Sequence, residues 1–368
     1  MKYNWQLSGW PEFKHQKSDK AEKMLSVLSE KIAHFSGMMK AMPKELQMDS
    51  ILQLMVSEAI KTSEIEGEFL NRPEVLSSIK NNLGLNQPRE KVNDRRAQGI
   101  GQLMVTVRDT FESPLTVEIL FEWHKMLLQG SRRIKIGGWR EHEEPMQVIS
   151  GTVGKEKIHF EAPPSSEVSA QMKRFIKWFN NTAPGKKDEI ISAPIRSAIA
   201  HLYFETIHPF EDGNGRIGRA IAEKALSQSI GRPVVLSLSQ TIEKNKKQYY
   251  LALEKAQQSN EITSWVEYFI QTVLNAQIQS ILLVELTLEK TRFFDRFKDK
   301  LNKRQLKVVR KMLEAEPEGF IGGMTAKKYI SITKASKATV TRDLQELVEM
   351  NVLLLQGGGR SIHYIIRI

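Results

Sequence analysis

The sequence contains no cysteine, which excludes disulfide bonds and thiolate metal sites and is typical of proteins in a reducing compartment. It also lacks the basic-then-apolar start of a signal peptide, and we expect no apolar run of membrane-spanning length. A cytoplasmic protein that does not contact a membrane is therefore expected.

Several common chemical motifs are absent as well. The chain has no Walker A lysine loop, no Rossmann glycine pattern after a strand and no HExxH zinc motif. Acidic residues are outnumbered, with 43 Asp and Glu against 54 Lys and Arg, a net charge of +11. The surplus is densest at 301–368, which holds 12 Lys and Arg against 6 Asp and Glu. This balance favours a polyanionic partner, although a mildly basic surface is also common without one.

Most of the chain has the spacing of amphipathic helices, so the predicted fold class is mainly α. Asn71 is expected to cap a further short helix that starts at Pro73. The other expected helices cover residues 18–42, 48–66, 89–111, 116–129, 166–181, 194–208, 214–229, 243–257 and 262–300.

One stretch interrupts this helical rhythm. Val148 and Ile149, the glycines at 151 and 154, and then Ile158 and Phe160 predict a β-hairpin. Two interpretations stay open: an ordinary surface hairpin, or a flap that positions a substrate.

The last seventy residues change character again. Helices expected at 303–315, 325–330 and from about 336 to 349 precede two short strands joined by a GGGR turn. This order is typical of a winged helix-turn-helix. Lys334, Lys337, Thr339, Thr341 and Arg342 could then contact DNA phosphates or base edges, and a protein-binding winged helix is the alternative.

The densest chemistry lies in HPFEDGNGRIGR, residues 208–219. A glycine-rich turn that opens a helix presents unpaired N–H groups and the positive end of the helix dipole, which together bind anions. Arg216 and Arg219 suit phosphate oxygens, Asp212 is a ligand that Mg²⁺ prefers beside phosphates, and His208 could accept a proton. The set predicts phosphoryl or nucleotidyl transfer.

The stretch matches the signature HxFx(D/E)GNGRxxR at every fixed position, and so resembles the Fic (filamentation induced by cAMP) family. Fic proteins transfer AMP, usually from ATP, to a hydroxyl group of a target protein. The resemblance implies a Fic-type helical core with the hairpin as its flap. It also implies that His208 is the general base, that Asp212 holds Mg²⁺ between the α- and β-phosphates, that Gly213, Asn214 and Gly215 line the anion hole, and that Arg216 and Arg219 bind the outer phosphates.

A second stretch, TSEIEGEFL, fits the inhibitory pattern (S/T)xxxE(G/N) of some Fic proteins through Thr62, Glu66 and Gly67. The resemblance implies that Glu66 pairs with Arg219 and misplaces the γ-phosphate. The alternative is an ordinary helix end with Gly67 as its cap.

Farther along, KKQYYLALEKAQ resembles the helix beside the adenine in this family. Tyr250 would border the base and Gln257 would bond near it, although aromatic residues at helical spacing are more often part of a core. His201 is expected to be a core or supporting histidine.

The predicted organisation is an N-terminal helical domain with the inhibitory helix at 1–90, a Fic core and connecting helix at 91–300, and a winged helix at 301–368. ATP and Mg²⁺ are the expected substrate and cofactor. The expected partners are a protein with a hydroxyl side chain, itself included, and DNA through 301–368, with a homodimer left open. Two alternatives stay open: transfer of UMP, phosphate or another phosphate-linked group, and removal of AMP with Glu66 orienting water. Gly215 leaves room for the β- and γ-phosphates, which favours transfer of AMP.

Overall fold

The structure is a computed structural model that describes residues 2–130, 134–150, 157–313, 320 and 322–367. It divides into two compact units, residues 1–281 and 282–368, with helix α11 (Thr263–Phe297) spanning the division. The predicted boundaries at residues 90 and 300 remain predictions.

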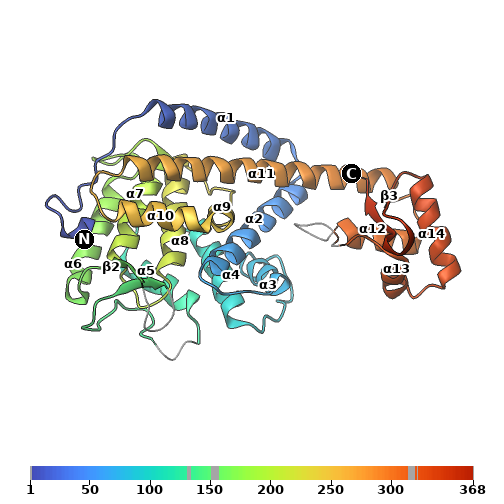
Figure 1. The fold of residues 1–368 in the computed structure, drawn as a ribbon, viewed down its shortest axis with the longest axis horizontal. Coiled ribbons are helices and arrows are strands. Elements are labelled where there is room, and N and C mark those ends of the chain that lie inside the picture. The colour runs from blue at the N-terminus through green and yellow to red at the C-terminus, as the bar shows by residue number, and fades with distance from the viewer. Residues whose placement is uncertain (1, 131–133, 151–156, 314–319, 321, 368) are drawn as a thin grey trace. The chain divides into compact units, whose positions relative to one another are not determined.

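The first unit is built almost entirely of helices (Figure 1). After a short 3₁₀ turn at Asn4–Gln6 they are α1 (Asp19–Ala41), α2 (Lys44–Ile65), α3 (Arg72–Asn82), α4 (Arg95–Asp109), α5 (Val117–Leu127), α6 (Ser165–Asn181), α7 (Ala193–Ile207), α8 (Asn214–Ile230), α9 (Leu238–Lys244) and α10 (Lys246–Ala256).

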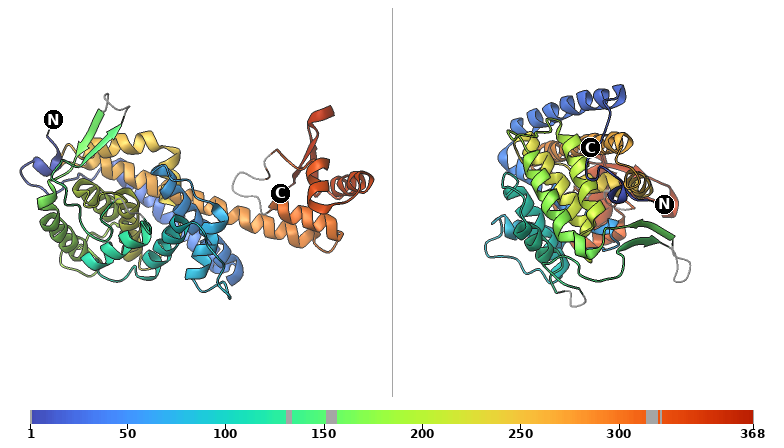
Figure 2. Two further views of the ribbon diagram at one scale, coloured as in Figure 1. Left: turned by 90° about the horizontal axis from the view of Figure 1, so that it is seen from below. Right: turned by 90° about the vertical axis from the view of Figure 1, so that its left-hand side faces the viewer.

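Helices α7 and α8 form the centre of this unit and pack closely against each other (Figure 2). Helix α7 is buried on all sides, as expected of a helix that is largely apolar around its whole circumference. Its buried Arg196 is satisfied by the carbonyl oxygens of Phe179 and Ala225 and by the side chain of Gln228. Because the 208–219 motif joins the end of α7 to the start of α8, this packed pair of helices positions it.

Two hydrophobic clusters surround this pair. One cluster includes residues from helices α2 to α8, among them Val56 on α2, Phe175 on α6 and Phe204 on α7. The other joins α1 and the first half of α11 to α7 and α10, with Leu28, Trp265 and Phe269 among its members. Helix α1 runs alongside α11 in Figure 1 as part of this second cluster.

The predicted hairpin is present as β1 (Gln147–Ser150) and β2 (Lys157–Glu161), which pair antiparallel with an irregularity between Val148 and Ile149. Its predicted turn at 151–156 lies outside the described residues. Phe160 is buried against the helices, whereas Ile149 and Ile158 are exposed. The hairpin projects from the helical body (Figure 2).

One expected helix, 243–257, is wrong at its start. Two helices cover this region. Helix α9 begins after Ser237, whose side chain accepts a hydrogen bond from the Gln240 amide and caps the helix. Asn245 then has a non-helical backbone (φ −125°, ψ 34°), so α10 begins only at Lys246. The helix expected from 89 begins at Arg95, where Asp94 caps it.

Helix α11 corrects the expectation that no segment approaches membrane-spanning length. By length and composition alone it could cross a membrane. More than half of its apolar window is buried within the protein, where Trp265, Phe269, Ile270 and Val273 pack in the core. These contacts account for its apolar character without a bilayer.

The second unit contains α12 (Lys303–Leu313), α13 (Ala326–Thr333), α14 (Lys337–Glu349), β3 (Leu353–Gln356), a 3₁₀ turn at Gly359–Ser361 and β4 (His363–Ile366). Strands β3 and β4 pair antiparallel. Buried Asp343 accepts hydrogen bonds from Asn302, Arg304 and Tyr329, and so joins α14 to α13 and to the start of α12. The helices and the hairpin follow one another in the predicted order.

Candidate active site

The turn between α7 and α8 is fixed by two left-handed residues. His208 ends α7 with φ 50° and ψ 59°, and its N–H donates to the Phe204 carbonyl. Gly213 begins α8 with φ 84°, a conformation that glycine adopts without steric cost. Between them, the Asn214 side chain donates to the Phe210 carbonyl and accepts from the Phe210 amide. Asn214 therefore shapes the turn, and its predicted place in an anion hole remains a prediction.

The first turn of α8 is built to hold an anion. Its leading N–H groups have no intrahelical partner. Arg216 and Arg219 follow on the same helix, and both are 2% exposed at the side chain. In the described part of the chain the buried Arg216 Nε has no hydrogen-bond partner. Two buried cations beside a helix N-terminus, one of them with an unpaired Nε, suit a polyphosphate.

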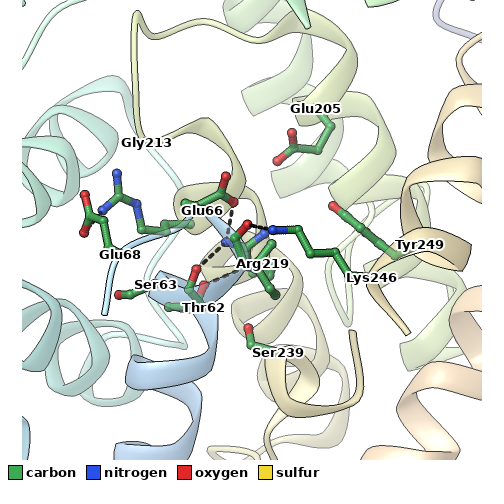
Figure 3. A network of polar contacts seen from close by, with 12 residues as sticks. Thr62, Ser63, Glu66, Glu68, Glu205, Gly213, Arg219, Ser239, Lys246 and Tyr249 are labelled. Atoms are coloured by element: carbon green, nitrogen blue, oxygen red, sulfur yellow. Dashed lines mark hydrogen bonds and ion pairs between the residues drawn. The ribbon is translucent and has the colours of Figure 1, made fainter. Parts of the chain in front are cut away.

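Helix α2 delivers two residues to Arg219 (Figure 3). Arg219 Nε donates to Thr62 Oγ1 at 2.7 Å, and its terminal nitrogen donates to the Thr62 carbonyl at 2.9 Å and to Glu66 Oε1 at 2.7 Å. Burial alone would raise the pKa of Glu66, but the charge and hydrogen bond of Arg219 outweigh it and lower that pKa. Glu66 is therefore ionised at neutral pH.

The Glu66 carboxylate also lies against the glycine turn. A Cβ atom added at Gly215 would overlap Glu66 Oε1 and lie 3.0 Å from its Cδ. The carboxylate thus occupies the N-terminus of α8, where an anion would bind. Gly67 has φ 81° and follows the helix end, as expected of a capping glycine. The stretch therefore both ends a helix and makes the predicted Glu66–Arg219 contact.

Two neighbouring contacts were missed by sequence reasoning. Glu68 Oε2 pairs with Arg216 at 2.7 Å, so each motif arginine carries a carboxylate from the same segment. The second acid of the EGEF stretch, two residues after Glu66, was the available signal. Lys246, on α10, donates to the Ile65 carbonyl at the end of α2 (Figure 3), and no sequence signal marked it.

The backbone around His208 is held by Arg140. Its Nε donates to the His208 carbonyl at 2.8 Å, and its amide donates to the Pro209 carbonyl at 2.9 Å. The guanidinium also bonds the Pro163 carbonyl, just after β2. Arg140 thereby links the base of the hairpin to the His208 turn. The sequence analysis assigned no role to Arg140.

The His208 side chain is 16% exposed. Burial, reinforced by the Arg140 charge, lowers its pKa to about 4. The imidazole is therefore neutral at physiological pH and has a lone pair that can accept a proton.

The two residues predicted near an adenine differ in their surroundings. Tyr250 is partly exposed on α10, one turn after Lys246, and burial raises its pKa to about 12. Gln257 is buried at the end of α10, where its side chain donates to the Glu205 carbonyl and its own carbonyl accepts from Asn4. Gln257 has a packing role, and base contacts of both residues remain predictions. His201 lies in the core and bonds Tyr249, as expected.

Asp212 is the one predicted metal ligand, and its side chain is 55% exposed. Within the described residues there is no group of three or more His, Cys, Asp or Glu that could hold a metal ion. Mg²⁺ at phosphate sites commonly uses one or two carboxylates plus phosphate oxygens. The Asp212 carboxylate accepts from the Gly213 amide and pairs with Arg216 at 3.3 Å through the same oxygen, Oδ1. A single, half-exposed carboxylate next to the anion site fits that arrangement once Arg216 turns to phosphate.

Comparison with known proteins agrees with this geometry. Residues 114–226 match the Fic/DOC family, and residues 3–85 match a domain of unknown function (DUF4172). The chain is 28% identical over 143 residues to protein adenylyltransferase fic-1 of Caenorhabditis elegans, covering 39% of this chain and 24% of that protein. It is 25% identical over 182 residues to protein adenylyltransferase Fic of Nematostella vectensis, covering 48% and 38%. The chain thus spans less than half the length of the curated relatives it matches.

Solved structures share the fold. A Fic family protein from Desulfovibrio desulfuricans G20 aligns with a TM-score of 0.56 at 17% identity, covering 96% of this chain and 97% of that one. Fic-1 from C. elegans aligns with a TM-score of 0.53 at 19% identity, covering 72% and 73%. Residues 114–226 therefore match a Fic/DOC domain, and the chain shares the mainly helical fold of these structures.

Proposed function

We propose that this protein is an adenylyltransferase, which moves AMP from ATP to a Ser, Thr or Tyr hydroxyl of a protein. We also propose that its own Glu66 inhibits this activity. The observation that carries the proposal is the Glu66 carboxylate, which lies on Gly215 and bonds Arg219 at the N-terminus of α8. An anionic side chain already fills an anion site, so the site suits a phosphate chain and the segment that fills it suits an inhibitor.

In the transfer step the hydroxyl oxygen forms a bond to the α-phosphorus, and the bond from that phosphorus to the bridging oxygen breaks. Pyrophosphate leaves with the electron pair. The hydroxyl proton passes to a ring nitrogen of His208, which is neutral and able to take it. The N–H groups of α8 and the two arginines hold the phosphates in place. Asp212 would hold Mg²⁺, which neutralises phosphate charge when bound.

The acceptor is best identified by mass spectrometry of proteins from a lysate incubated with ATP and the Glu66→Gly variant. An AMP group on hydroxyl side chains, absent when His208 is also replaced, is the expected finding. A modified population that does not depend on His208 would contradict the proposal.

Glu68 should contribute a smaller share of the inhibition, because it pairs with Arg216 but, unlike Glu66, does not lie against Gly215 in the first turn of α8. Breaking a partly exposed ion pair of about 0.5–1.5 kcal/mol should raise transfer about two- to tenfold at ATP concentrations below saturation. Label transfer from ATP by Glu68→Gln measures this. Glu64→Gln is the matched control, since Glu64 pairs with Lys61 and not with the motif. Equal rates for Glu68→Gln, Glu64→Gln and wild type would show that Glu68 has no part in inhibition.

A second candidate function concerns the C-terminal unit, which we propose is a winged helix that binds DNA. Helix α14 is capped at its N-terminus by the Ser336 side chain, and Lys337, Thr341 and Arg342 are exposed on it. An exposed helix with two cations and a hydroxyl, in a unit with surplus positive charge, suits a phosphate backbone.

Duplex DNA should bind the full-length protein with an affinity that falls steeply with salt. Replacing Lys337 and Arg342 with alanine should lower the affinity, and should reduce the slope of log affinity against log salt by about two if both contact phosphates. Lys311→Ala, an exposed cation on α12, serves as the control. Binding that is independent of salt, or equal in the two variants, would exclude this surface.

A further inference from the structure

Glu205 is a buried carboxyl group that the transfer step above does not use. It lies in the last turn of α7, three residues before His208, and is 5% exposed. The left-handed backbone of His208 turns the imidazole back over that last turn. As a result Glu205 Oε2 lies 3.9 Å from His208 Nδ1.

Within the part of the chain that the structure describes, this carboxyl group forms no other ion pair. The positive charge of Arg219 acts on Glu205, but Arg219 donates its hydrogen bonds to Thr62 and Glu66. Among the described residues, Glu205 Oε1 has no hydrogen-bond partner at all. A buried carboxyl oxygen without a donor costs free energy, so a group kept in that state calls for a reason other than stability.

The first turns of α8 leave room for this group. A Cβ atom at Gly218 would overlap Glu205 Oε1 and lie 3.2 Å from its Cδ. Any larger residue at 218 would push the carboxyl group away from its present place. The glycine inside the motif thus lets Glu205 stay beside His208.

The chemistry of His208 needs such a neighbour. Burial and the Arg140 charge disfavour a positive imidazole, yet the ring must become positive when it takes the hydroxyl proton. The ring of His208 donates a hydrogen bond to the backbone carbonyl of Glu205, which leaves the other ring nitrogen free for the hydroxyl. The Glu205 carboxyl group, 3.9 Å from Nδ1, would when ionised stabilise the imidazolium that forms.

We propose that Glu205 is the positioning residue of His208: its backbone carbonyl accepts the ring hydrogen bond, and its ionised carboxyl group stabilises the imidazolium that forms when the other ring nitrogen takes the target hydroxyl proton. The inference rests on the proposed function. Glu205 acts through His208 and touches neither ATP nor the acceptor.

The protonation state of Glu205 supplies a distinctive readout. Burial raises its pKa to about 8, with Arg219 opposing the rise and Glu66 adding to it. Only the ionised form carries the negative charge that stabilises the imidazolium, so the transfer rate should rise with pH until Glu205 has lost its own proton. The groups that face it are His201 and His208 on α7, Glu66 at the end of α2, Arg219 on α8 and Tyr249 on α10.

The test uses the full chain carrying Glu66→Gly, with and without Glu205→Gln. Glutamine keeps the shape and removes the ionisable group. We expect kcat to fall about ten- to a hundredfold with ATP affinity within about twofold, because the change affects only proton transfer. The rise of kcat toward pH 8 should disappear. Glu205→Asp should keep the pH-dependent rise at a reduced rate.

Ser197→Ala is the matched control, since Ser197 is also buried on α7 but bonds the Ala222 carbonyl away from the turn; its kcat and pH profile should be unchanged. Unchanged kcat and pH profile in Glu205→Gln would overturn the inference. A parallel loss of ATP affinity and thermal stability would overturn it too, by showing a structural role. Absence of transfer with Glu205 intact would instead refute the proposed function.

Discussion

Glu66→Gly should raise the rate of AMP transfer by about ten- to a hundredfold when ATP is well below saturation. The wild-type carboxylate occupies the N-terminus of α8 and bonds Arg219, so this contact must break before the γ-phosphate can take its place. A charge-assisted hydrogen bond of about 1.5–3 kcal/mol would lower the competent fraction by about that factor. Labelled ATP and a fixed acceptor concentration measure the rate.

Two further variants sharpen this result. Glu66→Asp should fall between wild type and Glu66→Gly, because its shorter side chain holds Arg219 less well. Glu64→Gly places the same helix-weakening residue in the same turn of α2 while leaving the Arg219 contact intact. A rate gain in Glu64→Gly equal to that of Glu66→Gly would attribute the effect to loosening of α2, and no gain in Glu66→Gly at any ATP concentration would remove Glu66 from regulation.

His208→Ala should abolish transfer, by about a hundredfold or more, while ATP still binds. The base acts on the incoming hydroxyl and not on the nucleotide. Since burial holds the imidazole neutral at physiological pH, its removal takes no positive charge from the phosphate site. Calorimetric titration with ATP and a transfer assay, both in the Glu66→Gly background, separate the two properties.

The control for this variant is His34→Ala, which removes an exposed histidine on α1. It should leave both binding and transfer unchanged. Equal loss of ATP affinity and transfer in His208→Ala would mean that His208 shapes the turn between α7 and α8 rather than accepting a proton.

The sequence predicted the parts of this site that are close together in the chain. Residues 208–219 contain a histidine, a carboxylate, glycines and two arginines within one turn and the start of one helix, so their proximity needs no tertiary information. The Glu66–Arg219 contact joins residues far apart, and it was predicted only because a second short pattern resembled a known family.

The remaining contacts depend on packing that no local pattern encodes. Arg140 reaches the His208 carbonyl across 68 residues, and Glu68 reaches Arg216 across 148. Helix α9 was missed because the predicted helix began at 243, and the Ser237 side chain that caps α9 was not recognised as a helix start. Glu205 is near His208 in sequence, but its role depends on the left-handed turn and on the space at Gly218, and neither is visible in residue spacing.

The most direct test of the central claim compares ATP labelled at the α-phosphate with ATP labelled at the γ-phosphate, each incubated with Glu66→Gly protein and an acceptor. Adenylyl transfer predicts that protein keeps the α label, that the γ label leaves with pyrophosphate, and that His208→Ala removes the signal. Retention of the γ label would show phosphate transfer, and retention of neither label would show that this site does not modify proteins with ATP; either result would contradict the account.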